Sequence, residues 1–101
     1  MQDYSIERSG VPNLDFTGEI IGQSGAPKPS ILIYRTDTKK FVGQLRADQK
    51  FSLAQHFDNA DGVIAWFKYN YSQTIVPAVQ DAIEDAAKHD DAFKAAWNEH
   101  V

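Results

Sequence analysis

The stretch ILIYRTDTKKFVGQLR, residues 31–46, carries the clearest structural signal in this chain of 101 residues. Residues 31–35 are rich in β-branched and aromatic side chains, which is typical of a β-strand. A tight polar turn at residues 37–40 follows, and residues 41–46 then run back as a second strand. The pattern predicts an antiparallel hairpin, and the rest of the fold is built outward from it.

A further strand is predicted upstream of this hairpin, over residues 14–23. Its apolar side chains Leu14, Phe16 and Ile20 recur at a period of two and therefore share one face. Gly18 falls on the same face, where a glycine marks either a bulge or the close approach of another backbone.

The segments on either side complete the predicted sheet. Residues 50–57 alternate again, with Phe51, Leu53 and Phe57 on one side, which indicates a fourth strand. Residues 1–13 are polar and end in a run that contains glycine and proline, so we expect an N-terminal arm or loop there.

The period of the apolar residues becomes helical after residue 57. Asp58, with Asp61 three positions later, approximates a capping box and predicts the start of a helix. The apolar stripe of this helix consists of Ala60, Val63, Ile64, Phe67 and Tyr71.

Two more helices are predicted toward the C-terminus. The second covers about residues 72–88, and it cannot begin much before Thr74 because Pro77 fits only in the first turn of a helix. Asp90 then caps a third helix. The stripe of the second helix is Ile75, Val79, Ala82, Ile83 and Ala86, and that of the third is Phe93, Ala96, Trp97 and Val101.

Strands come first and helices follow, which favours an α+β fold over a doubly wound parallel sheet. We expect a four-stranded antiparallel meander followed by two to three helices packed on one face. The chain length fits a single domain over residues 14–101, preceded by the arm at residues 1–13.

The formal charge of the chain is concentrated at its C-terminal end. Residues 1–76 hold eight acids and eight bases, whereas residues 77–101 hold six acids and two bases. The last segment therefore carries the whole net charge of −4. A one-sided charge favours binding to an oppositely charged partner.

The composition disfavours several classes of function. The chain has no cysteine, which excludes disulfides and cysteine-based zinc sites and fits a cytoplasmic protein. The first residues lack the apolar core of a signal peptide, and no apolar run is long enough for a membrane helix. We expect no catalytic, cofactor-binding or metal-binding residues, since no motif for them is recognised.

Three stretches resemble a loose group of small uncharacterised bacterial proteins carried by plasmids, phages and other mobile elements. They are ILIYRT at residues 31–36 with residues 41–42, then residues 59–67 ending in VIAWF, and the acidic, alanine-rich segment at residues 82–101. The connector at residues 23–30 departs from the pattern of that group. The resemblance implies a small accessory protein of a mobile element and transfers no catalytic residues.

The leading hypothesis places a protein-binding surface on the late helices. Carboxylates on one helical face can dock on a basic surface, including one that normally holds a phosphate backbone. Aromatic side chains beside such acids serve as interface anchors. The expected partner-binding residues are Asp81, Glu84, Asp85, Asp90, Asp91, Trp66 and Tyr69.

Other readings exist for parts of this surface. The same acids fit an ordinary solvated helix face, since exposed helices commonly carry charge. Trp66 falls off the buried stripe of its helix, so it is either exposed as an interface anchor or packed under the second helix.

An alternative function is the binding of RNA or single-stranded DNA by the sheet. Single strands bind where aromatic side chains stack on bases and basic side chains hold phosphates on an open sheet face. The residues of this predicted surface are Tyr34, Arg35, Lys39, Lys40, Phe41 and Arg46. The net negative charge opposes this function, and lysines at a hairpin tip also protect edge strands from pairing.

A further alternative is a metal-dependent hydrolase that uses His56, Asp58 and Asp61 at the junction of a strand and a helix. Their spacing matches no recognised metal motif, and the two aspartates equally fit a helix cap.

We therefore expect a non-enzymatic, inhibitor-like accessory protein, and its concrete form would be a mobile-element counter-defence inhibitor of the anti-CRISPR type. Its expected partner is a basic protein surface, such as that of a nucleic-acid-handling complex. The oligomeric state is left open.

Overall fold

The computed structural model describes residues 1–24, 31–46, 52–70 and 77–97. Its strands form one five-stranded antiparallel sheet in the order β1-β2-β3-β4-β5. The strands are β1 (Gln2–Arg8), β2 (Val11–Ser24), β3 (Ile31–Thr36), β4 (Phe41–Arg46) and β5 (Ser52–Phe57). The α+β class and the antiparallel meander are confirmed.

The sheet has five strands where the sequence predicted four, because the N-terminal segment pairs with β2. Residues 2–8 lie within the predicted arm, yet they form β1, whose Ile6 is opposite Leu14. This strand was not recognised because most of its side chains are polar and exposed. Tyr4 and Ile6 are the side chains of β1 that pack in a core.

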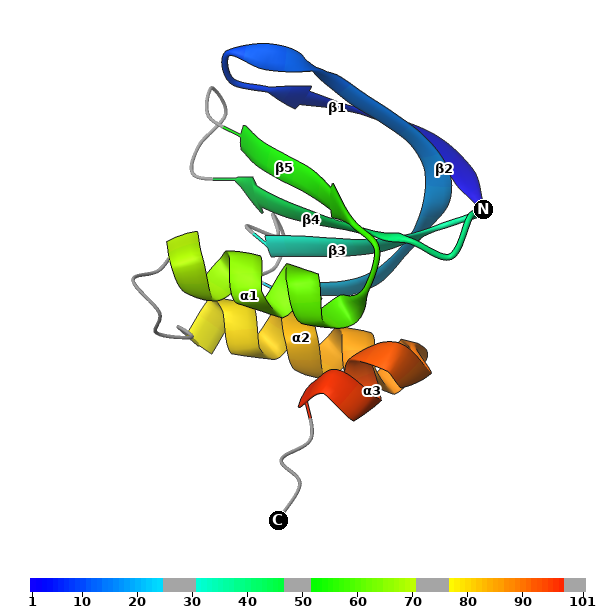
Figure 1. The fold of residues 1–101 in the computed structure, drawn as a ribbon, viewed down its shortest axis with the longest axis vertical. Helices are drawn as coiled ribbons and strands as arrows, with labels where there is room; N and C mark the ends of the chain where they lie inside the picture. The colour runs from blue at the N-terminus through cyan, green and yellow to red at the C-terminus, as the bar shows by residue number, and fades with distance from the viewer. Residues whose placement is uncertain (25–30, 47–51, 71–76, 98–101) are drawn as a thin grey trace.

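A bulge at Ile21 bends β2 and curls the sheet (Figure 1). Ile20 pairs with Tyr34 and Gly22 pairs with Ile33, so Ile21 is an extra residue on β2. A bulge bends the strand that carries it and increases the local twist. As a result, β1 and the first half of β2 turn over the face of the sheet that the helices do not cover.

Gly18 marks a close approach rather than the bulge itself. A Cβ atom at this position would lie 2.4 Å from the backbone oxygen of Arg35, which is too close for any side chain. Of the two alternatives that the sequence left open for this glycine, the structure shows the second.

The curl gives β3 and β4 a buried face on both sides. The first core lies between the sheet and the helices, and Phe67 and Phe93 are its largest fully buried side chains. The second core lies inside the curl and contains Ile6, Leu32, Tyr34, Val42 and Ala54. Successive residues of β3 therefore alternate between two cores instead of between a core and solvent.

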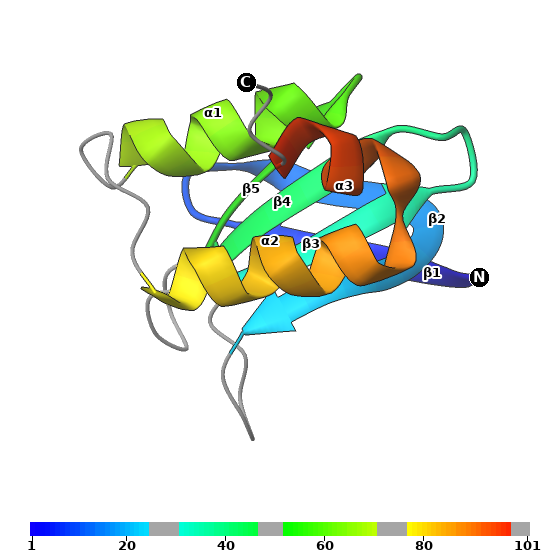
Figure 2. The same ribbon diagram turned by 90° about the horizontal axis from the view of Figure 1, so that it is seen from below.

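The helices in the described residues all cover the same face of the sheet (Figure 2). They are α1 (Ala60–Asn70), α2 (Pro77–His89) and α3 (Asp91–Trp97). α2 packs on β2 and β3, α1 packs on β4 and β5, and the short α3 touches both longer helices. None of the helices in this part of the chain has the length and apolar character needed to cross a membrane.

The helical stripes were largely predicted. The buried residues of α2 are Val79, Ala82, Ile83 and Ala86, as expected, and α2 begins at Pro77. Tyr71, Ile75 and Val101, which the sequence added to the three stripes, lie outside the described residues.

The cap of α1 is Asn59 rather than Asp58. The Asn59 side-chain oxygen accepts a hydrogen bond of 2.8 Å from the amide of Gly62, which satisfies one of the free donors at the helix start. Asp58 instead lies 3.4 Å from the ammonium group of Lys40 on the hairpin turn.

Candidate functional site

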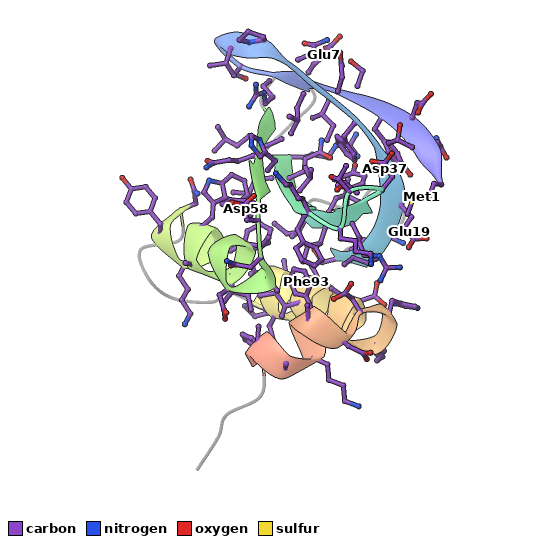
Figure 3. The ribbon with its side chains drawn as sticks, turned by 45° about the vertical axis from the view of Figure 1, so that its right-hand side comes forward. Met1, Glu7, Glu19, Asp37, Asp58 and Phe93 are labelled. Atoms are coloured by element: carbon purple, nitrogen blue, oxygen red, sulfur yellow. The ribbon has the colours of Figure 1, made fainter. Side chains whose placement is uncertain are left out.

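An ion-pair cluster centred on Arg35 joins the sheet to the late helices. The Arg35 guanidinium donates to Glu19 on β2 and, over 2.9 Å, to Asp90 at the junction of α2 and α3. The hydrogen bonds to Glu19 and Asp90 raise the pKa of Arg35 above its ordinary value, so this side chain stays charged. Figure 3 shows Glu19 on β2, on the side of the molecule where α2 and α3 meet.

Asp90 uses both of its carboxylate oxygens. The first caps α3 by accepting hydrogen bonds from the amides of Ala92 at 2.8 Å and Phe93 at 3.2 Å, as the sequence predicted. The second pairs with Arg35. Asp90 is only 8% exposed, so one buried carboxylate fastens the start of α3 to the sheet.

The sequence assigned Asp90 and Arg35 to two competing binding surfaces, and the structure brings them together. Asp90 was expected on the acidic protein-binding face, and Arg35 on the basic nucleic-acid face. Each satisfies the charge of the other, so a partner at either surface would have to compete with this internal pair.

Three of the expected acids remain open to solvent. Asp81 and Glu84 project from α2, and Asp91 projects from the first turn of α3. Glu84 accepts a hydrogen bond of 3.0 Å from the Gln80 amide. Within the described part of the chain, none of these carboxylates forms an ion pair, whereas Asp90 does.

Asp85 is turned toward the sheet. One carboxylate oxygen accepts a hydrogen bond of 3.2 Å from the backbone amide of Gln23 on β2. The other lies 3.6 Å from the Nδ1 atom of His89 one helical turn later. Asp85 therefore belongs to the contact between α2 and β2 rather than to the freely exposed acids.

The two aromatic residues of the predicted surface differ in exposure. Trp66 is half-buried between Phe57 and Phe67, and its ring lies over Gly43 of β4. Trp66 thus packs on the sheet, whereas the sequence predicted that it is either exposed or packed under the second helix. Tyr69 is 82% exposed on α1 and is free to act as an anchor.

The aromatic rings of the predicted nucleic-acid surface lie in separate cores. Tyr34 is buried in the second core, where its hydroxyl donates a 2.8 Å hydrogen bond to Gln44. Phe41 is buried in the first core against Phe93, with ring centroids 5.1 Å apart. Both faces of the sheet are covered at these strands, so neither ring is available to stack on a base.

The basic residues of that predicted surface do not gather in one place. Lys39 and Lys40 are exposed at the β3–β4 turn, and Lys39 adopts a left-handed backbone with φ of 64°. Arg46 is exposed at the opposite end of β4. With Arg35 held by two carboxylates, the hairpin offers no continuous basic face.

A cavity of about 800 Å³ opens where the β3–β4 turn meets the starts of α1 and α3. Part of its charged lining is neutralised, because Arg35 pairs with Asp90 inside it and Asp58 pairs with the neighbouring Lys40. The cavity also contains Phe41, but its remaining charges are mixed in sign. It therefore offers no charge pattern that selects one ligand class.

The residues of the predicted metal site do not converge. His56 is exposed on β5, Asp58 pairs with Lys40, and Asp61 is exposed in the first turn of α1. Among the described residues, no three His, Asp or Glu side chains lie close enough together to hold a metal ion.

A second acidic region was missed by sequence analysis. The β1–β2 hairpin presents Asp3 and Asp15, which accept hydrogen bonds from the hydroxyls of Thr17 and Ser5 across the two strands. Figure 3 shows Glu7 on the same hairpin, far from the helices. The signal was present as the four acids and one base of residues 1–24, but it was hidden by the basic residues that follow.

Comparisons with protein-family models, with curated proteins and with solved structures found no match to this chain.

Proposed function

We propose that this chain is a non-enzymatic protein-binding domain that uses the exposed carboxylates of α2 and α3 to contact a basic partner. The observation that carries this proposal is the absence, among the described residues, of any ion pair to Asp81, Glu84 or Asp91. Unpaired surface charges raise the rate at which an oppositely charged partner associates.

The internal pairing of Asp90 and the position of Asp85 narrow the proposed surface. A partner contacts Asp81 and Glu84 on α2 and Asp91 on α3. Tyr69, which is exposed on α1, serves as an additional aromatic anchor. Helices supported by a packed sheet hold such carboxylates in fixed positions, which favours a specific contact over a diffuse one.

The concrete form that we propose is an inhibitor-like accessory protein of a mobile element, of the counter-defence type. Its target would be the basic surface of a nucleic-acid-handling complex, because carboxylates in fixed positions can occupy sites that otherwise bind phosphates. The resemblance of three stretches to small mobile-element proteins supports this form; they are residues 31–36 with 41–42, residues 59–67 and residues 82–101.

Affinity capture from a bacterial lysate tests the proposal. Asp81→Asn, Glu84→Gln and Asp91→Asn, combined in one variant, remove three charges from the helical surface without changing side-chain size. We expect the affinity of this variant for the captured partner to fall at least tenfold, which corresponds to about 1.4 kcal/mol of binding free energy. Added duplex DNA should release the partner from the wild-type chain.

A charge-matched control separates the surface from net charge. Glu7→Gln, Asp37→Asn and Asp61→Asn remove the same number of charges from exposed positions elsewhere. This control should retain the partner. Equal binding by both variants, or equal loss in both, would contradict the proposed surface.

A further inference from the structure

The second half of β2 is an edge of the sheet. β1 pairs with β2 only as far as Gly18, whereas β3 pairs with β2 as far as Ser24. Among the described residues, no strand bonds to the outer side of β2 beyond Gly18. Figure 2 shows this end of β2 at the rim of the sheet, next to α2. Open strand edges are templates for pairing with another chain.

Two side chains of α2 bond to the backbone of this edge. Asp85 accepts the Gln23 amide over 3.2 Å, and the His89 Nδ1 atom lies 3.2 Å from the Ile21 carbonyl oxygen. The same Nδ1 atom is 2.9 Å from the carbonyl oxygen of Asp85. Because both oxygens can only accept, the Nδ1 atom carries the proton and donates to them.

These backbone groups are the ones that a neighbouring strand would use. In an antiparallel pair, a strand offers amides and carbonyls to its neighbour from alternate residues. Ile21 and Gln23 are such alternate residues, and α2 satisfies the carbonyl of one and the amide of the other. α2 can reach them because Gly22 has no side chain: a Cβ there would lie 2.3 Å from the Ala82 carbonyl oxygen.

We propose that Asp85 and His89 form an edge cap, which prevents two copies of this chain from pairing through the open half of β2. The favoured occupant of the uncapped edge is a second copy, because its donor and acceptor are self-complementary. Across a two-fold axis, the Gln23 amide of each copy meets the Ile21 carbonyl of the other.

The charge and exposure of this edge also favour self-pairing once the cap is removed. Glu19 is the single charged residue in segment 19–24, and Arg35 already neutralises it. Ile20, which is 42% exposed, adds apolar surface beside the edge.

The bulge at Ile21, in contrast, distorts the strand and so acts together with the cap against pairing.

Sedimentation velocity over a range of concentrations tests the edge cap. The wild-type chain should remain a monomer. The double variant Asp85→Ala, His89→Ala should approach twice the monomer mass as concentration rises. The matched control Asp81→Ala, Glu84→Ala removes two exposed side chains from the same helix and should remain a monomer.

A third substitution distinguishes edge pairing from nonspecific association. Ile20→Lys on the double variant places an unpaired charge beside the edge and should restore the monomer. The proposal is overturned if the double variant is folded and stays monomeric, or if it associates equally well with Ile20→Lys present. A dimeric wild-type chain would likewise overturn it.

Amide exchange gives a second readout if the double variant does not fold. In a dilute solution of the single variant Asp85→Ala, the Gln23 amide should exchange faster than in wild type. In a concentrated solution of the same variant, its exchange should slow down. Fast exchange at every concentration would show that no second copy covers the edge. These readouts do not depend on the acidic surface proposed above, so the two proposals can fail separately.

Discussion

Tyr34 shows how its position in the curl sets the chemistry of one side chain. Its hydroxyl lies in the second core, and its ring contacts those of Tyr4 and Phe16 at centroid distances of 4.9 and 5.1 Å. The pKa of Tyr34 is raised from 10.0 to about 12, mainly because its hydroxyl is buried and to a lesser extent because Tyr4 is nearby. The folded chain therefore keeps this hydroxyl neutral at pH values where the unfolded chain ionises it.

This pKa shift predicts a loss of stability in alkali. The contribution of Tyr34 to the free energy of unfolding is fully present below pH 10, its pKa in the unfolded chain. This contribution is lost as the pH rises through about 12, its pKa in the folded chain. Tyr34→Phe cannot ionise, so its stability should fall less steeply over that interval. Urea unfolding at a series of pH values measures this slope. Tyr69→Phe, at an exposed position, should follow the wild-type slope, and an unchanged slope in Tyr34→Phe would contradict the assignment.

Local roles of single residues were predictable, but their tertiary partners were not. The spacing of Asp90 before an apolar stripe identified it as a helix cap, because capping involves amides two or three residues away. Its pairing with Arg35 joins positions that are 55 residues apart. No periodicity reports such a contact, so the two residues were assigned to different surfaces.

At the level of elements, α3 depends on its attachment to the sheet. It has seven residues, too few to be stable alone in water. Its attachment consists of the Asp90 carboxylate and the fully buried Phe93, which Figure 3 shows pointing into the space between α3 and the sheet. Loss of either contact should therefore loosen α3 before the rest of the fold.

Asp90→Ala tests this attachment. We expect the free energy of unfolding to fall by about 1–3 kcal/mol, because the change removes a helix cap and leaves Arg35 with one carboxylate instead of two. Amide exchange in α3 should increase more than exchange in α1. The neighbouring variant Asp91→Ala, at an exposed position, should change stability by less than about 0.5 kcal/mol. Equal effects of the two substitutions would show that Asp90 does not hold α3.

Elements with strong periodicity were predicted well, and elements without it were missed. The stripes of α1 and α2 and the β3–β4 hairpin repeat their pattern over several residues. β1 buries two side chains, and one of them only in part, so its sequence resembles a polar arm. The sequence predicts Asp58 as the cap of α1, whereas the cap is Asn59, because Asp and Asn are both good caps and spacing alone does not separate positions 58 and 59.

At the level of the whole molecule, two cores share the same two central strands. Side chains of β3 and β4 enter both cores, so loosening one core removes support from the other. This arrangement predicts that the helical side and the curled side unfold in one transition. The sequence indicated the helical core through its periodicity, but not the second core, which depends on the bend at Ile21.

Ile6→Ala tests the coupling of the two cores. Ile6 is buried in the second core, and we expect its truncation to lower the free energy of unfolding by about 2–4 kcal/mol. Trp66 and Trp97 both pack on the helical side and report on it by fluorescence. Their midpoint in urea should fall together with that of far-ultraviolet circular dichroism. The control Val11→Ala, at an exposed position, should change both midpoints little. A fluorescence midpoint that differs from the circular dichroism midpoint in Ile6→Ala would contradict the coupling.

The single extra residue in β2 has a consequence at the level of the gene. Deleting the codon for Ile21 would keep Ile20 opposite Tyr34 and Gly22 opposite Ile33, so strand alignment would survive. The strand would straighten, however, and the N-terminal hairpin would no longer fold back over Val42. Ile21 also packs in the first core, so we expect the loss of this one codon to weaken both interiors of the molecule.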